Sequence, residues 1–346
     1  MQKFLLLFVV GATTLPGQTQ TAIRELIDGG HWKRARVLVA QNGGSDAESL
    51  YLAATVKQAY GELDAAEKFA ERAIAANPKE AQYHFRLSTV LGEKAQKAGV
   101  LHQIGLARAF KRESDATLAL NPNHPEALAN LMQFYLQAPG IVGGDKAKAH
   151  AIPERLAAID PVRCVQTQIE LARADKQDAK IEEIIKKAVT MKAETYEAHM
   201  MVANYLARLK DPHYDDALRH AREAQRMKPD RAGAHSLIAV ILARQDKWAE
   251  LDAALAQAEK DVPDNLYPYF RAADVLLDRK VDLARAERYD RKYLTIEPER
   301  GFPSEAIARW RLGLVLAQQG RKPEAIAEWK TSVKLDPKSP AQKELK

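Results

Sequence analysis

The residue types that could carry chemistry in this chain are a glycine-rich turn, nine histidines and one cysteine. The turn reads Gly140-Ile-Val-Gly-Gly-Asp145, and backbone N–H groups at the start of a helix can bind a phosphate. Its glycine spacing fits neither a dinucleotide-binding loop nor a P-loop, and Asp145 would repel an anion. We therefore interpret it as a structural turn: Pro139 ends one helix, Gly143 and Gly144 permit positive φ, and Asp145 caps the next helix.

The histidines and the cysteine do not form a convincing metal or nucleophile pattern. His84, His199 and His235 recur at the same place in three sequence repeats, which is typical of packed core histidines rather than metal ligands. Cys164 is the single cysteine, so no intramolecular disulfide or cysteine metal cage can form. No Gly-x-Ser-x-Gly nucleophile motif occurs. The sequence therefore predicts no enzyme, no cofactor and no metal.

Composition argues against a nucleic-acid partner. Across 346 residues, 52 basic and 46 acidic side chains give a formal charge of +6, with both signs interspersed. The basic run Lys33-Arg34-Ala35-Arg36 has no interleaved aromatics on which bases could stack. Hydrophobic residues make up 46% of the chain, which is enough to bury a large core. We expect a folded protein that does not bind nucleic acid.

The first residues have the layout of an export signal. Lys3 precedes the apolar run Phe4–Val10, and Pro16 leads into a polar stretch. We assign residues 1–21 to a signal peptide, which predicts a periplasmic or secreted protein; an uncleaved amphipathic or buried N-terminus is the alternative. The run is too short to cross a bilayer, and no later segment has eighteen unbroken apolar residues. No membrane span is expected after signal removal.

Proline pairs recur along the chain at 32- to 44-residue intervals when Ala193 stands in for one missing proline. Because proline cannot continue a helix, each pair ends one, and a period of this length indicates a solenoid. The pairs are Asn77-Pro78, Asn121-Pro122, Asp160-Pro161, Lys228-Pro229, Val262-Pro263, Glu297-Pro298 and Asp336-Pro337.

The clearest unit, residues 47–80, contains two amphipathic stretches separated by Gly61. Its small residues Ala54, Ala66 and Ala73 stand where two antiparallel helices must approach closely. This unit resembles the tetratricopeptide repeat, as does the unit starting at Ala306 with its Leu312-Gly313 pair. The resemblance implies an all-α, right-handed superhelical solenoid of seven to eight helix-turn-helix units over residues 47–337. A truncated helix pair at 22–46 precedes it and a polar tail at 338–346 follows.

Two insertions interrupt the repeats, near residues 91–107 and 137–145. The first predicts two over-long helices and the second is the glycine-rich turn, so both should form one ridge. This combination resembles a set of exported bacterial tetratricopeptide proteins, and more distantly the repeat proteins associated with periplasmic TRAP-type transporters. Neither resemblance implies a particular ligand.

In the tetratricopeptide family the concave groove is lined by the first helix of each unit, at its second, fifth, ninth and twelfth or thirteenth residues. The resemblance implies a protein or peptide partner bound there, since aromatic and arginine side chains are typical interface anchors. A carboxylate clamp is not implied, because Tyr51 and Thr55 replace its Lys and Asn. Some of these side chains could instead pack between repeats. Carried onto this sequence, the groove set is Tyr51, Phe85, Gln133, Met200, Asn204, Arg208, Arg244, Tyr267, Phe270, Asp274 and Trp310.

The final repeat predicts an association face. Ile326, Trp329 and Val333 share one face of the last long helix, and nine polar-rich residues after Pro337 are too few for a capping helix. We expect this face to pack against a second copy or a partner.

The sequence thus predicts a non-enzymatic scaffold that binds a protein or peptide in its groove within the cell envelope. The alternative is a transporter-associated or ligand-sequestering periplasmic protein that binds a small molecule near the two insertions. A continuous open groove would favour the first, and an enclosed apolar pocket bounded by residues 98–106 and 138–145 would favour the second.

Overall fold

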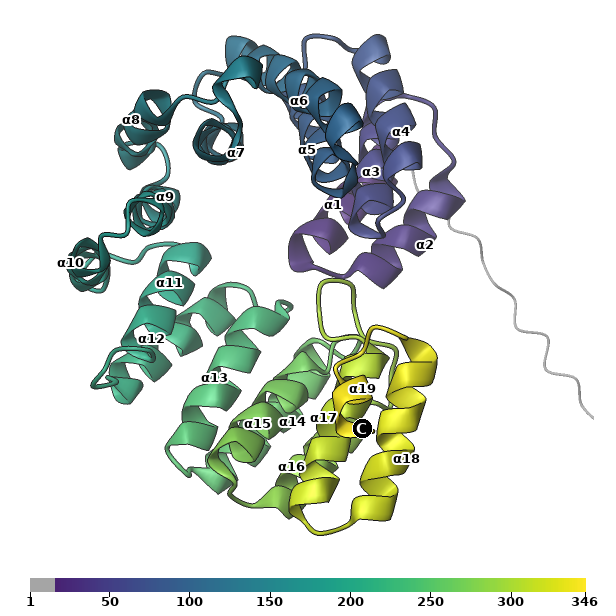
Figure 1. Ribbon diagram of the computed structural model, residues 1–346, viewed down its shortest axis with the longest axis vertical. Coiled ribbons are helices and arrows are strands. Elements are labelled where there is room, and N and C mark those ends of the chain that lie inside the picture. The colour runs from purple at the N-terminus through teal and green to yellow at the C-terminus, as the bar shows by residue number, and fades with distance from the viewer. Residues whose placement is uncertain (1–15) are drawn as a thin grey trace, which may run out of the picture.

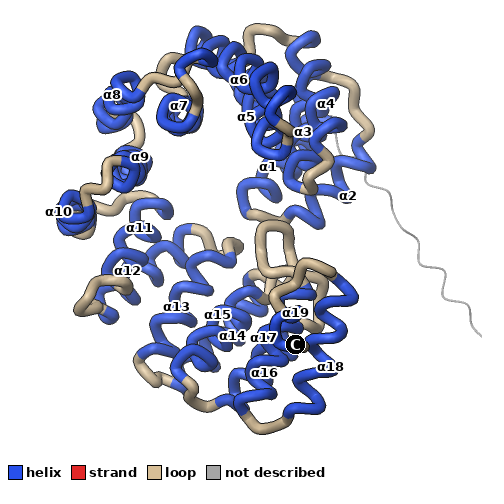
Figure 2. The backbone as a smooth tube through the Cα atoms, viewed as in Figure 1, coloured by secondary structure: helices blue, strands red, loops and turns tan. Residues whose placement is uncertain are grey.

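The computed structural model describes residues 16–346, and all regular structure in that range is helical (Figure 2). The apolar core of the predicted export signal, Phe4–Val10, lies outside the described residues. The first half of the described chain comprises α1 (Pro16–Gly29), α2 (Trp32–Asn42), α3 (Ala47–Ala59), α4 (Leu63–Ala76), α5 (Ala81–Lys97), α6 (Val100–Leu120), α7 (Pro125–Gln137), the 3₁₀ helix η1 (Gly140–Val142), α8 (Lys146–Ala157), α9 (Pro161–Ala174) and α10 (Asp178–Ala188). The second half comprises α11 (Tyr196–Leu206), α12 (Tyr214–Met227), α13 (Ala232–Arg244), α14 (Trp248–Asp261), α15 (Tyr267–Arg279), α16 (Leu283–Tyr293), α17 (Glu305–Gln318), α18 (Lys322–Leu335) and α19 (Ala341–Glu344).

Helices α3 to α18 form eight successive antiparallel pairs, which confirms the predicted solenoid. The pairs follow one another around a ring, and the α1–α2 pair lies beside the C-terminal repeats (Figure 1). Within the pairs, alanines allow the close approach of the helix axes. Ala54, Ala66 and Ala73 are fully buried, as their spacing predicts.

The helix boundaries follow local chemistry. The side chains of Asp46, Asp160 and Ser304 accept hydrogen bonds from the first-turn N–H groups of α3, α9 and α17. The turn inside the first clean repeat needs a left-handed residue, and Gly61 supplies it with φ 73°. In the α9–α10 pair, which has no turn glycine, Lys176 takes the same conformation with φ 58°. The pair is therefore complete although its sequence signature is incomplete.

The two insertions are built largely as the sequence predicts. Helices α5 and α6 have 17 and 21 residues and pack along each other as one long hairpin. After α7, Pro139 and Gly140 lead into η1, Gly143 has φ 103°, and Asp145 accepts a hydrogen bond from the Lys148 N–H at the start of α8.

Gly144 does not have the positive φ predicted for it. Glycine is required at position 144 for a steric reason instead. A Cβ there would lie 1.8 Å from the carbonyl oxygen of Ala138. The turn folds back so tightly on the end of α7 that no side chain fits there. Gly140, in contrast, has no atom within 4 Å of the place where a Cβ would be.

The ring is closed by polar contacts between the α1–α2 pair and two loops of the C-terminal half. We call this the closing contact; its centre is Glu299, only 2% exposed. The carboxylate of Glu299 accepts the backbone N–H of Lys33 at 2.6 Å, in the first turn of α2. The side chain of the N-cap residue His31 does not cap α2. The Glu299 carboxylate, 266 residues away in the sequence, accepts the first-turn N–H instead.

Further hydrogen bonds and ion pairs complete the closing contact. The Lys33 ammonium donates to the carbonyl oxygens of Asp264 and Glu297, at 3.1 and 2.6 Å. The Asp264 carboxylate lies 3.0 Å from Nδ1 of the His31 ring and 2.9 Å from Nε of the Arg34 guanidinium. Arg300 donates to the Ala59 carbonyl and its guanidinium lies over the Tyr60 ring.

The pKa values of the two acids reflect these surroundings. Burial raises the pKa of Glu299, although the N–H and ammonium of Lys33 work in the opposite direction. Burial would also raise the pKa of Asp264, but the hydrogen bond from His31 and the charges of His31 and Arg34 outweigh it, and the pKa falls. Asp264 is therefore held ionised by its partners, whereas Glu299 depends on Lys33.

The C-terminus corrects the predicted association face. Trp329 is 8% exposed and packs in a cluster with Leu312, Leu316 and Ala341 of the short helix α19. Its indole N–H donates to the Trp310 carbonyl at 3.2 Å. The tail predicted to be too short for a cap thus contributes a cap, because Ser339 hydrogen-bonds the buried Ser332 hydroxyl at 2.6 Å.

The other two residues of the predicted association face differ in their exposure. Val333 is half-buried beside the cluster and Ile326 remains exposed. Association with a second copy through Ile326 stays a prediction.

Replacing Glu299 with alanine should loosen the closing contact while the repeats stay folded. The Lys33 amide loses its acceptor, and hydrogen bonds to charged groups contribute about 1.5–3 kcal/mol. Amide hydrogen exchange at residues 33–35 should accelerate by roughly ten- to a hundred-fold. Glu297→Gln is the matched control, because Lys33 uses only the Glu297 main-chain oxygen. Unchanged exchange in Glu299→Ala would contradict the closing contact.

Trp329→Ala should lower the free energy of unfolding by about 3–5 kcal/mol, as expected for removal of a buried aromatic. Ile326→Ala, on the same helix but exposed, should change it by less than about 1 kcal/mol. Urea denaturation followed by circular dichroism measures both. Equal effects of the two substitutions would mean that Trp329 is not core.

Gly144→Ala should be far more damaging than Gly140→Ala, although both lie in the same turn. The new Cβ at 144 would overlap the Ala138 carbonyl, so the turn must move, at a cost of about 1–3 kcal/mol. Alanine at 140 meets open space. The difference between their urea midpoints is the measurement, and similar midpoints would contradict the geometry of the turn.

Candidate binding pocket and groove

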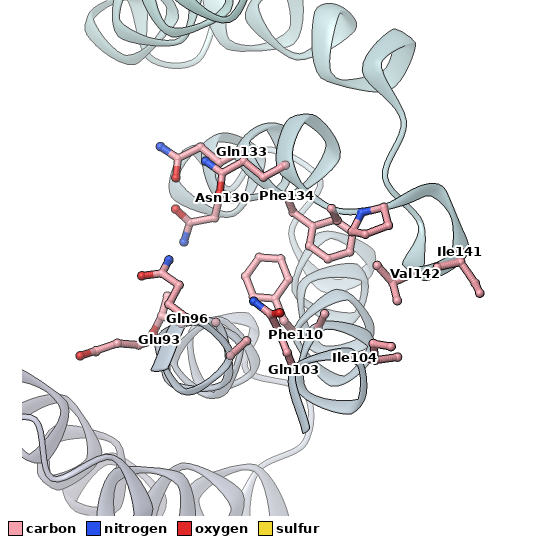
Figure 3. A pocket seen from close by; sticks show the side chains of 17 residues that line it. Glu93, Gln96, Gln103, Ile104, Phe110, Asn130, Gln133, Phe134, Ile141 and Val142 are labelled. Atoms are coloured by element: carbon pink, nitrogen blue, oxygen red, sulfur yellow. The ribbon is translucent and has the colours of Figure 1, made fainter. Parts of the chain in front are cut away.

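A pocket of about 650 Å³ lies between the long α5–α6 hairpin and the α7–η1 segment (Figure 3). We call it the hairpin pocket. It is lined by 89–96 of α5, 103–110 of α6, 130–137 of α7 and 138–142 of the glycine-rich turn. It therefore lies at the two insertions that distinguish this chain from a plain repeat array.

The middle of the hairpin pocket is aromatic. The rings of Phe110 and Phe134 meet with centroids 5.3 Å apart, and Figure 3 shows them facing each other from α6 and α7. Gly92 of α5 makes room for this pair, since a Cβ there would lie 3.1 Å from the Phe110 ring. Ile104 and Ile141 are exposed at one end, Ile141 to 78%. That end is apolar surface open to a ligand.

The other end of the hairpin pocket carries side-chain amides. Gln96 of α5 points toward Asn130 and Gln133 of α7, and Gln103 lies near the Phe110 ring (Figure 3). Each amide offers two N–H donors and a carbonyl acceptor. The charged lining residue Glu93 is ion-paired with Lys97 at 2.8 Å. The pocket thus combines an apolar floor with a neutral hydrogen-bonding mouth.

Several predicted groove residues have side chains accessible to a partner. Gln133 lines the hairpin pocket and donates to the Glu170 carboxylate at 3.2 Å. Met200 and Asn204 are four residues apart on α11, so they share one face, and both are half-buried; Arg208 lies just beyond the end of α11 and is exposed. Arg244, the last residue of α13, is also exposed.

Three predicted aromatic anchors are buried by packing within the chain instead. Tyr51, Phe85 and Phe270 are only 7–8% exposed. Tyr51 packs on Tyr83 at 5.4 Å between ring centroids, Phe85 on His124 at 4.5 Å, and Phe270 on Tyr293 at 5.2 Å. Tyr51 and Phe85 fit the alternative of inter-repeat packing, because each stacks against the next repeat, whereas Phe270 packs within its own α15–α16 pair.

The remaining groove predictions also meet partners within the chain. Tyr267 is the first residue of α15 and packs on Phe302 of the loop that carries Glu299, with centroids 4.6 Å apart. Asp274 is ion-paired with Arg311. Trp310 is half-buried, with Arg311 beside its ring. These residues belong mainly to the structure of the last repeats.

Gln96, Gln103 and Asn130 were not predicted from the sequence. Asn130, Gln133 and Gln137 recur at three- and four-residue spacing on α7, which is a signal for one polar face. Gln96 and Gln103 lie in the first insertion, where no repeat register applies, so nothing in the sequence pairs them with α7.

Two of the three repeat histidines are buried as predicted, whereas His84 is half-buried and its ring lies 2.9 Å from the Glu113 carboxylate. His199 and His235 are buried, and the His199 ring hydrogen-bonds His220 at 3.0 Å. Burial lowers the pKa of both His199 and His220, so the pair is neutral at pH 7. Within residues 16–346, no group of three His, Cys, Asp or Glu side chains could hold a metal ion, and no helix is long and apolar enough to cross a membrane.

Comparison with known proteins gives one family match and several distant structural similarities. A tetratricopeptide-repeat model matches residues 299–340. No curated protein matches the chain. Human IFIT1, solved as a dimer with m7Gppp-AAAA, has 14% identity and a TM-score of 0.47, covering 96% of this chain and 80% of its own.

Two other solved structures show the same level of similarity. Yeast Tom70 has 12% identity and a TM-score of 0.43, covering 94% of this chain and 86% of its own. Pseudomonas aeruginosa PilF has 15% identity and a TM-score of 0.39, covering 64% of this chain and 95% of its own.

The matched segment contains α17 and α18, and the helix pairs from α3 to α16 repeat the same antiparallel arrangement. The Leu312-Gly313 pair in it fits this match, because a Cβ at Gly313 would overlap the Trp329 indole of the partner helix. Residues 299–340 thus match the tetratricopeptide repeat, and the helix pairs before them have the same antiparallel arrangement.

Proposed function

We propose that this protein is a non-enzymatic scaffold that binds a protein or peptide partner along the first helices of its repeats. The observation that carries the proposal is the hairpin pocket. Thr89, Gln133 and Gln137 line it, and they are the ninth and thirteenth residues after the N-caps of α5 and α7. Those are groove positions in the tetratricopeptide family, so the insertion deepens the groove at this place.

The chemistry of the hairpin pocket suits an extended peptide segment. Asn and Gln side chains offer a donor and an acceptor together, as a peptide backbone requires. The Phe110–Phe134 floor can receive one large apolar side chain from such a segment. Apart from Glu93, which is paired with Lys97, the lining is uncharged, which favours an uncharged stretch of the segment at this place.

A small molecule is the second candidate for the same pocket. The volume of about 650 Å³ lies within the 300–1,000 Å³ typical of small-molecule sites. The lining at residues 103–104 and 138–142 agrees with the place where the sequence predicts such a ligand. Ile141, at 78% exposure, leaves this end open rather than enclosed, which favours the peptide.

The cell envelope is part of the proposal on sequence grounds. Lys3 and the apolar run Phe4–Val10 have the layout of an export signal and lie outside the described residues. N-terminal sequencing of the chain recovered from a periplasmic fraction of a bacterial host would test it: removal of residues up to about Thr21 is expected, and an intact cytosolic chain would contradict it.

Affinity capture from an envelope extract tests the scaffold. Gln133→Arg places a long charged side chain at the amide mouth and should abolish retention of a protein that the unsubstituted chain retains. Gln257→Arg is the control, because Gln257 is exposed on the second helix α14. A partner retained equally by both variants would show that the hairpin pocket is not its docking site.

Native mass spectrometry of the purified chain separates the two candidates. A bound small molecule in the unsubstituted protein that is absent from Gln133→Arg, with no protein retained in the capture, would favour the second candidate and overturn the scaffold.

A further inference from the structure

Three arginines occupy the same position in three consecutive repeats. Arg173, Arg208 and Arg244 each follow the N-cap residue of α9, α11 and α13 by thirteen residues, the N-caps being Asp160, Thr195 and Arg231. We call them the arginine row. The equivalent residue of α7 is Gln137, which lines the hairpin pocket, so the row begins one repeat beyond that pocket.

The arginine row is unpaired. All three side chains are exposed, and among residues 16–346 none of them has a side-chain hydrogen bond, ion pair or aromatic ring partner. The next equivalent position behaves differently: Arg279 binds both oxygens of Asp246, at 2.8 and 2.9 Å, and the Ala243 carbonyl. Three successive repeats therefore present guanidinium groups that the fold itself leaves free.

Arg173 and Arg208, the first two arginines of the row, both lie near Tyr205. Burial raises the pKa of the Tyr205 hydroxyl, and the charges of Arg173 and Arg208 both work against that rise. Two guanidiniums from neighbouring repeats therefore lie within electrostatic reach of one tyrosine. Tyr205 is half-buried and packs against the cluster that contains Val165 and Ile169 of α9.

One arginine in each repeat is a spacing that an extended polypeptide can follow. Helix α11 packs against both α9 and α13, and packed helices lie about 8–10 Å apart. In a polyproline II segment, three residues advance about 9 Å and bring successive side chains onto one side. One acidic side chain in every three residues would meet one arginine in each repeat, and guanidinium binds carboxylate with two parallel hydrogen bonds.

We propose that the arginine row binds an extended acidic polypeptide segment with Asp or Glu at about every third residue. The proposal rests on the proposed scaffold function and names the chemistry of a second part of its partner. A nucleic acid fits less well, because the row offers one charge per repeat and no exposed aromatic ladder on which bases could stack.

Fluorescence anisotropy with two labelled peptides of the same composition tests the proposal on the full chain. One peptide contains four Glu-Pro-Ser repeats, and the other carries its four glutamates consecutively. The spaced peptide should bind about ten-fold more tightly than the clustered one. The variant Arg173→Gln/Arg208→Gln/Arg244→Gln should bind it about ten- to a hundred-fold more weakly, since each exposed ion pair contributes modestly.

Arg72→Gln/Arg288→Gln is the matched control, because both residues are exposed on second helices, α4 and α16. Arginines near helix C-termini also favour the helix dipole. A purely structural role would lower the thermal midpoint of the triple variant and leave its peptide affinity unchanged, which would overturn the proposal. Equal affinity for the two peptides, or no binding of either, would overturn it as well.

A single-stranded oligonucleotide serves as the competing probe. If it binds more tightly than the spaced peptide and the triple variant loses it, the row belongs to a nucleic acid and the proposal fails. The scaffold is judged separately by the Gln133→Arg capture, which leaves the row intact. A captured partner together with no peptide binding overturns the row alone, and peptide binding with no captured partner overturns the scaffold alone.

Discussion

The contact between the buried Glu299 carboxylate and the first turn of α2 is the constraint on which the shape of the molecule depends. A carboxylate removed from water must be matched by donors or charges, and here the Lys33 amide donates a hydrogen bond while the Lys33 ammonium forms an ion pair at 3.4 Å. That requirement fixes the α1–α2 pair against loops more than 230 residues away. These contacts hold the α1–α2 pair beside the C-terminal repeats, so the array of helix pairs forms a ring (Figure 1).

The aromatic residues near the C-terminal loops serve the same constraint. Tyr267 and Phe270 are predicted as anchors for a partner, but they pack on Phe302 and Tyr293, and the Tyr293 hydroxyl donates to the Pro303 carbonyl at 2.7 Å. These contacts hold the loop that carries Glu299. The sequence shows that such residues lie on first helices; it cannot show which aromatic faces a partner and which faces a loop, because a shift of one residue rotates a side chain by about 100°.

Helical periodicity and proline spacing were sufficient to predict the repeats, the over-long hairpin and the Asp145 cap, since these depend on residues close together in the chain. The hairpin pocket could be located only to its two insertions. Its floor is formed where Phe110 packs on Phe134, in space that is open because residue 92 is a glycine. Its mouth is formed by side-chain amides from different helices. The closing contact was not predictable, because Lys33 and Glu299 are ordinary surface residue types until the solenoid has turned far enough to bring them together.

The closing contact is polar, unlike the interfaces between repeats. In the described chain no buried hydrophobic cluster spans the joint: Ile23 belongs to a cluster with Leu50 and Tyr83, whereas Phe270 and Tyr293 form another. Partly exposed ion pairs such as Arg34 with Asp264 contribute about 0–1 kcal/mol and weaken with salt. Separating a repeat from its neighbour instead exposes buried side chains, at about 1.5–3 kcal/mol for each large one. Neighbouring repeats are therefore held together mainly by apolar burial, whereas the joint is held by polar contacts and should separate at a lower cost than a repeat from its neighbour.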